Sequence, residues 1–117
     1  MLKDAKCFKK IVIVCGRVDM RKGADGLAAI VRLRYGINTL EKDTLFLFRG
    51  LHTDRIRGLV WEGDGYLLLS KRLIRGSFQW PRNREEAKTI TQEEFERLMN
   101  GFAIDPVIRL SKPQKSA

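Results

Sequence analysis

The sequence has few of the residues that build metal sites and disulfide frameworks. Its 117 residues include two cysteines, Cys7 and Cys15, and one histidine, His52. The cysteines lack the Cys-x-x-Cys spacing of zinc and redox motifs, and His52 has no companion ligands in a zinc pattern. We therefore expect buried, reduced thiols and no metal or cofactor. A metal or disulfide role for the cysteines is the less favoured alternative.

Long hydrophobic runs are also missing. Runs such as Ile11 to Cys15 and Leu67 to Leu69 are far shorter than the roughly 20 residues that cross a bilayer. Lys9 and Lys10 interrupt the N-terminal apolar stretch, which argues against a secretory signal. The chain has no clear basic amphipathic helix or lipidation signal. We expect a cytoplasmic protein without a membrane partner.

Length and composition are those of one globular domain. Hydrophobic residues make up 44% of the chain and charged residues 32%, unlike the apolar-poor composition of disordered proteins. A chain of this size buries one modest core. We expect a single domain over residues 1–103 and a partly disordered tail over 104–117, which ends in a Lys, Ser and Pro stretch.

The positive charge belongs to one part of the chain. The net charge is +9, and residues 1–82 hold 17 Lys and Arg against 8 Asp and Glu, whereas residues 83–117 hold 6 of each. A basic field favours polyanions, because neutralising phosphates releases condensed counterions. Charge alone is equally compatible with a basic surface that binds no nucleic acid.

Hydrophobic periodicity predicts an α+β fold with a mainly antiparallel sheet of about five strands and two helices, both packed on one side of the sheet. Strands are expected over residues 11–15, 44–48, 55–62, 65–73 and 77–80, and a loop over 82–88.

The first helix is expected over residues 20–35, between Asp19 as N-cap and Gly36 as C-terminal stop. Gly23 and Gly26 weaken it by about 1 kcal/mol each, so close packing or a ligand should require them. The second helix opens at Thr91 with a capping box to Glu94. Its apolar face comprises Phe95, Leu98, Met99 and Phe102.

A β-hairpin with Gly63-Asp64 as its two-residue loop is the clearest structural signal. This loop pairs Trp61 with Tyr66, Val60 with Leu67, Arg57 with Ser70 and Arg55 with Arg72. Side chains alternate between the two faces of a strand. One face is assigned to the core: Ile56, Val60, Leu67 and Leu69. The other is a candidate contact surface: Arg55, Arg57, Leu59, Trp61, Tyr66, Leu68 and Arg72.

Trp61 and Tyr66 allow two interpretations. They can stack on unpaired bases beside the arginines, or they can belong to a second hydrophobic layer or a protein interface. For these aromatic residues we favour the second interpretation, and for the arginines we favour nucleic acid.

Three cations, Arg17, Arg21 and Lys22, surround the start of the first predicted helix, where they oppose the helix dipole. They either form a phosphate site with the free N–H groups of the first turn, or point to solvent and pair with Asp19 and Asp25. The spacing of a nucleotide-binding P-loop is missing. Phosphodiester backbone is therefore favoured over ATP as the ligand.

Carboxylates are not spaced for catalysis. Metal-dependent strand transfer needs clustered carboxylates, for which the candidates are Asp19, Asp25, Asp54, Glu62 and Asp64. Structural roles are favoured, since Asp19 suits a helix cap and Asp64 a turn. Nothing in the spacing supports a Ser-His-Asp nucleophile built on His52. We expect no enzymatic activity, with a metal-dependent endonuclease as the less favoured alternative.

Six ordered motifs carry a family resemblance: Asp19-Met20-Arg21-Lys22 with Gly26-Leu27, Leu47-Phe48-Arg49-Gly50, Asp54-Arg55-Ile56-Arg57, Gly63-Asp64-Gly65-Tyr66, Lys71-Arg72-Leu73 with Arg75-Gly76, and Phe78-Gln79-Trp80-Pro81. Together with the helix that opens at Thr91, they resemble the TnpB accessory protein of the IS-sixty-six family of bacterial insertion sequences, between about Ile13 and Phe102. Val18 replaces a usual proline, Leu51-His52-Thr53 a more basic stretch, and Val60-Trp61 a tryptophan pair.

The resemblance implies a transposition protein that works beside a separate, larger transposase, which carries the acidic catalytic residues. We expect a non-catalytic accessory factor with element-end or target DNA and the transposase as partners. A scaffold that recruits the transposase without touching DNA is the alternative. No sequence feature fixes the oligomeric state. The expected DNA-binding residues are Arg17, Arg21, Lys22, Arg49, Arg55, Arg57, Lys71, Arg72 and Arg75, with Trp61 and Tyr66 as base-stacking or partner contacts.

Overall fold

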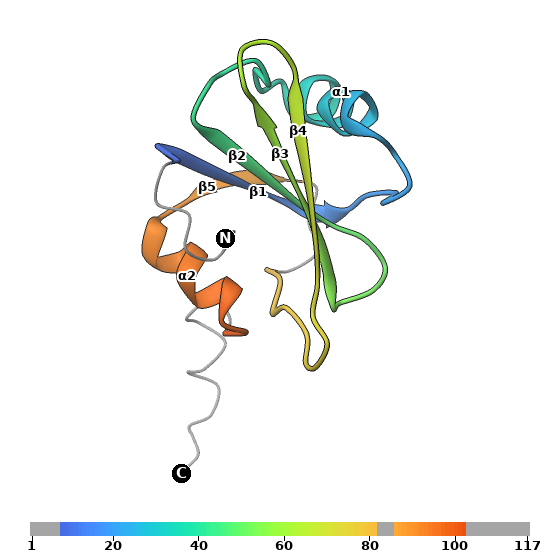
Figure 1. The fold of residues 1–117 in the computed structure, drawn as a ribbon, viewed down its shortest axis with the longest axis vertical. Coiled ribbons are helices and arrows are strands. Elements are labelled where there is room, and N and C mark those ends of the chain that lie inside the picture. The colour runs from blue at the N-terminus through green and yellow to red at the C-terminus, as the bar shows by residue number, and fades with distance from the viewer. Residues whose placement is uncertain (1–7, 82–85, 103–117) are drawn as a thin grey trace.

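The computed structural model describes residues 8–81 and 86–102, which build a five-stranded sheet and two helices (Figure 1). The elements are β1 (Lys10–Arg17), α1 (Ala24–Tyr35), β2 (Thr44–Arg49), β3 (Arg55–Trp61), β4 (Tyr66–Arg72), β5 (Ala87–Ile90) and α2 (Gln92–Met99). The strand order is β4-β3-β2-β1-β5. Only β1 and β2 pair in parallel, through the α1 connection, and the other three pairings are antiparallel. The predicted α+β class with a mainly antiparallel sheet is confirmed.

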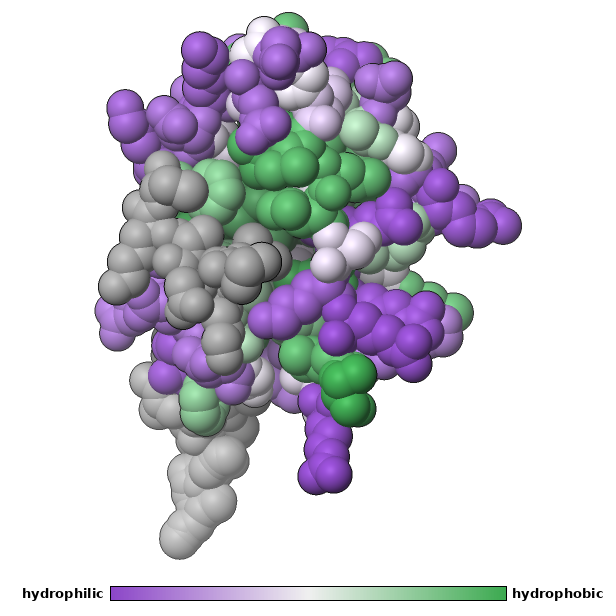
Figure 2. Space-filling view, viewed as in Figure 1, coloured by the Kyte–Doolittle hydropathy of each residue, from purple (hydrophilic) through white to green (hydrophobic). Residues whose placement is uncertain are grey.

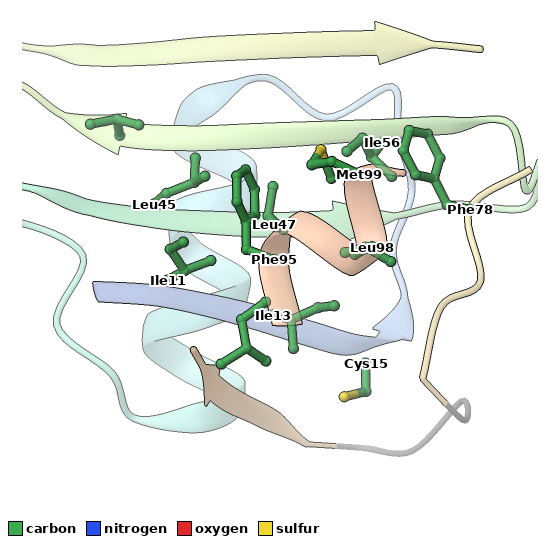
Figure 3. Close-up of a cluster of buried hydrophobic side chains, with 12 residues drawn as sticks. Ile11, Ile13, Cys15, Leu45, Leu47, Ile56, Phe78, Phe95, Leu98 and Met99 are labelled. Atoms are coloured by element: carbon green, nitrogen blue, oxygen red, sulfur yellow. The ribbon is translucent and has the colours of Figure 1, made fainter. Parts of the chain in front are cut away.

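The two helices lie on opposite faces of the sheet, so the prediction that they share one side is wrong. Figure 3 shows α2 in front of the sheet and α1 behind it. The α2-side core comprises Ile11, Ile13, Cys15, Leu45, Leu47, Ile56, Val60, Phe78, Ile90, Phe95, Leu98 and Met99. The α1-side core comprises Val12, Val14, Val18, Leu27, Ala28, Val31, Phe46, Phe48 and Leu59. β1 and β2 are continuous apolar runs, and such strands need cover on both faces.

Helix α1 begins later than predicted, because Asp19 is engaged in the preceding turn instead of capping the helix. The Asp19 carboxylate accepts a hydrogen bond from the Arg21 backbone N–H at 3.0 Å. Gly23 is the N-cap, without a side-chain hydrogen bond. Gly36 ends the helix as predicted, with a left-handed φ of 68° and its N–H donated to the Arg32 carbonyl. The prediction of a Met20 start is therefore wrong by one helical turn.

The β3–β4 hairpin has the predicted register, from Trp61 opposite Tyr66 to Arg55 opposite Arg72. The Glu62 N–H donates to the Gly65 carbonyl across the loop. On the α2 side Ile56 and Val60 are buried and Leu69 packs against the core, as predicted. Leu67 is 39% exposed, so its assignment to the core is wrong. It lies on the outermost strand, beyond the cover that α2 provides.

The last strand was misplaced by the sequence analysis. Residues 77–80 form no strand, although Phe78 and Trp80 are anchored: the Phe78 N–H donates to the Thr53 carbonyl, and Trp80 Nε1 donates to the Val14 carbonyl at 3.0 Å. The fifth strand is β5, which pairs antiparallel with β1. The loop predicted over 82–88 is wrong at Ala87 and Lys88, and residues 82–85 lie outside the described residues.

Helix α2 starts with the predicted capping box. The Thr91 hydroxyl accepts the Glu94 N–H at 3.0 Å, and the Glu94 carboxylate accepts the Thr91 N–H at 2.8 Å. Phe95, Leu98 and Met99 are buried. Phe102 lies beyond the helix and is 58% exposed, so its assignment to the apolar face is wrong.

The structure also bears on the thiols and on membrane insertion. Cys15 is buried, as predicted, and its thiol donates to the Glu86 carboxylate at 3.8 Å. Cys7 lies outside the described residues. Across residues 8–81 and 86–102, neither helix is long and apolar enough to traverse a bilayer.

Candidate nucleic-acid-binding groove

A groove of about 690 Å³ lies where three chain segments meet at one end of the sheet. Its walls are the β1–α1 connection, the β2–β3 connection and the paired ends of β3 and β4. Both connections lie on the right of Figure 1. The lining residues are Val18, Asp19, Met20, Arg21, Gly50, Leu51, His52, Arg55, Ile56, Arg57, Ser70, Lys71 and Arg72. The fold thus brings together segments that are separated by more than 30 residues.

The groove is strongly basic. Five of its lining side chains are cations, and all five were expected to bind DNA: Arg21, Arg55, Arg57, Lys71 and Arg72. Asp19 is the one carboxylate in the lining. At neutral pH the lining therefore carries a clear excess of positive charge.

Arg57 links two walls of the groove. It lies on β3, and its Nη1 donates a hydrogen bond of 3.2 Å to the Lys22 carbonyl in the β1–α1 connection. A guanidinium has five N–H donors in a planar fork, so this bond leaves others available. Arg57 is therefore held in position while it remains able to bind an anion.

Arg55 and Arg72 lie directly opposite each other on β3 and β4. Like charges in this arrangement repel each other. The Asp54 carboxylate lies close to both, 3.5 Å from Arg55 Nε and 3.9 Å from Arg72 Nε. Because both arginines are exposed, these contacts add little stability and only partly offset the repulsion.

Arg21 is oriented by a two-bond contact with Asp19. Arg21 Nε donates to Asp19 Oδ1 and Nη2 donates to Oδ2, both at 3.1 Å. The Arg21 guanidinium lowers the pKa of Asp19 to about 2, chiefly through these side-chain bonds. In return, Asp19 raises the pKa of Arg21. Asp19 is thus ionised at neutral pH and positions the Arg21 guanidinium in the turn before α1.

Arg17 and Arg49 lie side by side beyond the groove, as register partners at the ends of the parallel strands β1 and β2. Partial burial lowers the pKa of Arg49, and the charge of Arg17 lowers it further. Arg49 lines a small adjoining hollow together with His52 and Arg55, which also line the groove. The basic surface therefore continues from the groove to this arginine pair.

The apolar floor of the groove, formed by Val18 and Met20 on the α1 side of the sheet, was not predicted from the sequence. Gly50 creates room for it, because a Cβ at that position would lie 2.2 Å from Met20 Cγ. Gly50 stands in the motif after β2, and a glycine that ends an apolar run was the available signal for a close approach. His52 and Ser70 were also missed as lining residues.

Lys22 and Arg75, two of the expected DNA-binding residues, do not line the groove. The Lys22 stem packs over α1, and a Cβ at position 26 would lie 3.1 Å from Lys22 Cβ. A larger residue at position 26 would therefore require the Lys22 stem to shift by a few tenths of an ångström. Arg75 is exposed in the turn after β4.

Trp61 and Tyr66 lie at the far end of the hairpin, away from the groove. Their rings contact each other edge to face, with centroids 5.1 Å apart. The Tyr66 hydroxyl lies 2.9 Å from Thr39 Oγ1, and its ring packs against the α1-side core. Leu59 and Leu68 also belong to or pack on that core. The predicted contact face is therefore divided into a cationic end and a largely covered apolar end.

Trp61 also borders a shallow hollow of about 370 Å³ on the α2 side, with Phe8, Val60 and Leu67. Figure 2 shows hydrophobic side chains gathered over the strands on this side, with hydrophilic ones around them.

In the described part of the chain, no three His, Cys, Asp or Glu side chains are grouped to hold a metal ion.

The fold and the groove define a class of protein: a small basic α+β domain with one helix on each sheet face and a cation-lined groove at one sheet end. The family model described as "IS66 Orf2 like protein" matches residues 9–109, and the chain belongs to this family of insertion-sequence accessory proteins. The resemblance predicted from the ordered motifs is confirmed.

Relatives match over most of their length. Uncharacterized protein y4jC of Sinorhizobium fredii (strain NBRC 101917 / NGR234) is 33% identical over 110 residues, which are 92% of this chain and 93% of the relative. Uncharacterized protein y4hO of the same strain is 34% identical over 93 residues, 80% of each chain. No solved structure gives a significant match.

Proposed function

We propose that this protein binds DNA through the basic groove and assists a separate, larger transposase without catalysing strand transfer itself. The observation that carries this proposal is the groove lining, in which five cations face a single carboxylate. Cations gathered at one place repel each other, so a bound polyanion stabilises the arrangement. For an insertion-sequence protein, the phosphodiester backbone of the element is the polyanion at hand.

The proposed contact surface extends beyond the groove. The Arg17–Arg49 pair adjoins it through the hollow that Arg49 and Arg55 share. Lys22 and Arg75 are exposed and add charge at its margins. Together these residues supply enough cations to neutralise several phosphates along a backbone, which fits non-sequence-specific positioning on DNA.

A non-catalytic role fits the carboxylates of the groove. Strand transfer by two metal ions uses several converging carboxylates. Asp19 alone lines the groove, and its oxygens accept hydrogen bonds from Arg21. In this proposal the acidic catalytic residues belong to the transposase.

The test is the salt dependence of DNA binding, measured by fluorescence anisotropy with element-end and random duplexes at 50 and 200 mM salt. We expect binding to both at low salt and a steep loss of affinity at high salt. Arg55→Gln with Arg57→Gln should lower the slope of log affinity against log salt by about 2, since each phosphate contact contributes about 0.9.

The matched control removes the same charge elsewhere, with Arg32→Gln and Arg34→Gln on the exposed side of α1. This pair should change the slope far less than the groove pair. Equal slopes for the two double variants would overturn the groove as the site. No binding to either duplex at low salt would overturn DNA binding altogether.

We propose as a second role that the hollow bordered by Phe8, Val60, Trp61 and Leu67 contacts the transposase. The supporting observation is the exposure of Leu67, on the edge strand β4, beside the half-buried Trp61 of β3. Co-purification with the transposase of the element should weaken with Trp61→Ala and persist with Leu33→Ala on α1. Unchanged association of the Trp61 variant would count against this surface.

A further inference from the structure

The groove combines a size and a lining that a phosphate alone does not explain. Its volume of about 690 Å³ falls within the roughly 300–1,000 Å³ of clefts that enclose small organic ligands. A phosphate group would occupy a small part of that space. The remaining space calls for a larger ligand that is attached to the phosphate.

The lining divides into an apolar floor and a cationic rim. Val18 is buried on the α1 side of the sheet, the half-buried Met20 packs against the same core, and both line the groove. The methionine thioether is polarizable and makes favourable contacts with ring systems. A nucleotide has the same two halves, since its base is a flat ring with apolar faces and its phosphate is an anion.

The positions of the cations match this division. The Lys22 carbonyl positions the Arg57 guanidinium, and the Asp19 carboxylate positions the Arg21 guanidinium, so both cations are held at the β1–α1 connection. His52 lines both the groove and the adjoining hollow, where its flat ring can face a base. The phosphate would bind between the fixed guanidinium groups while the base lies against the floor.

A base-paired nucleotide cannot reach this floor. In a duplex the faces of each base are covered by stacking, and the phosphates lie on a broad convex surface. A concave site of this volume therefore favours a nucleotide whose base is free of its partner, at a strand end or in an unpaired flap.

We propose that the groove binds one unpaired nucleotide of a DNA strand, with its base against Met20 and His52 and its phosphate on Arg57 and Arg21. This inference deepens the proposed function and rests on it. It assigns to the protein a preference for element ends whose strands are frayed or cut, over intact duplex.

The experiment compares three DNA ligands by fluorescence anisotropy: a blunt duplex, the same duplex with a three-nucleotide single-stranded overhang, and that overhang made of abasic residues. The overhang should bind at least about fivefold more tightly than the blunt end, the low end of the gain from stacking one base. The abasic overhang should lose this gain, because it keeps the phosphates and lacks the bases.

Two variants test the floor. Met20→Ala and His52→Ala should each bring the ratio of overhang to blunt affinity closer to one, whereas Leu33→Ala, on exposed α1 surface, should keep the ratio. His52 is exposed, so its variant tests the site without a loss of core packing.

Equal affinity for all three ligands, or a gain that survives in the abasic overhang, would overturn the nucleotide site while DNA binding stands. A lack of binding to every ligand would overturn the proposed function together with this inference.

Discussion

Gly50→Ala is the change that tests the packing of the groove most directly. A Cβ at Gly50 would lie 2.2 Å from Met20 Cγ and 3.4 Å from Met20 Cβ. The backbone of Gly50 is outside the left-handed region, so alanine adds no conformational strain there. Any loss of stability therefore comes from the contact with Met20.

The size of the effect follows from how far Met20 can adjust. Overpacking a tight site costs about 1–3 kcal/mol, and the unbranched methionine side chain can rotate away, which favours the lower part of that range. We expect a loss of about 1–2 kcal/mol in the free energy of unfolding. For a domain of this size, that loss lowers the melting temperature by about 4–8 °C.

Thermal unfolding followed by circular dichroism measures the effect, with Gly65→Ala as the control. A Cβ at Gly65 would meet no atom within 4 Å, and Gly65 is not among the glycines with left-handed backbone, so that variant should change stability by less than about 0.5 kcal/mol. Adding Met20→Ala to Gly50→Ala should recover part of the loss, since the two side chains no longer collide. Strictly additive losses in the double variant, or equal melting temperatures for Gly50→Ala and the wild type, would refute the reasoning.

Three further variants test other contacts. Asp54→Asn removes the carboxylate beside Arg55 and Arg72 and should tighten DNA binding about threefold at low salt. Weaker binding by this variant would oppose the proposed function. A magnesium-dependent nicking activity of the wild type that the variant lacks would oppose it as well. The pKa of Asp19 is about 2 in the folded protein and near 4 in the unfolded chain, so the Asp19–Arg21 contact stabilises the fold above pH 4 and this stabilisation is lost as the pH falls from 4 to 2. Asp19→Asn should therefore make stability less dependent on pH between 4 and 2. An unchanged acid-unfolding curve would contradict the lowered pKa of Asp19. Thr91→Ala removes the capping box of α2 and should cost about 1 kcal/mol in urea unfolding, with Thr53→Ala, exposed in a loop, as the neutral control.

Local signals predicted the elements that are fixed by local chemistry. The hairpin register follows from Gly63-Asp64, and the start of α2 follows from the reciprocal bonds of Thr91 and Glu94. The C-terminal end of α1 at Gly36 follows from the left-handed backbone that glycine accepts there. Each of these features depends on a few neighbouring residues, so the sequence alone specifies them.

Elements that depend on distant partners were misjudged. β5 is a four-residue edge strand with a charged and a polar residue, and its place is set by pairing with β1 about 75 positions earlier in the chain. The helices were assigned to one side, although β1 and β2 lack any alternation of polar residues. A continuous apolar strand demands cover on both faces, so this sequence feature was sufficient to predict opposite faces.

The cations of the groove were predicted from the sequence as separate DNA-binding residues. The strand topology explains why they lie together. The parallel pairing of β1 and β2 brings Arg17 and Arg49 to the same end of the sheet. β3 runs antiparallel to β2, so its first residue begins at that end, and β4 returns to it.

The cationic motifs therefore lie at strand termini at the same end of the sheet, although they are spread over more than 50 positions of the sequence. The parallel pairing of β1 and β2 places the cations of the β1–α1 connection at the same end of the sheet as those of β2, β3 and β4. A hairpin in its place would reverse β2 and carry its arginine to the opposite end of the sheet. The cations of β2, β3 and β4 would still lie together, but at the opposite end of the sheet from those of the β1–α1 connection. The crossover through α1 therefore joins these two groups into a single site.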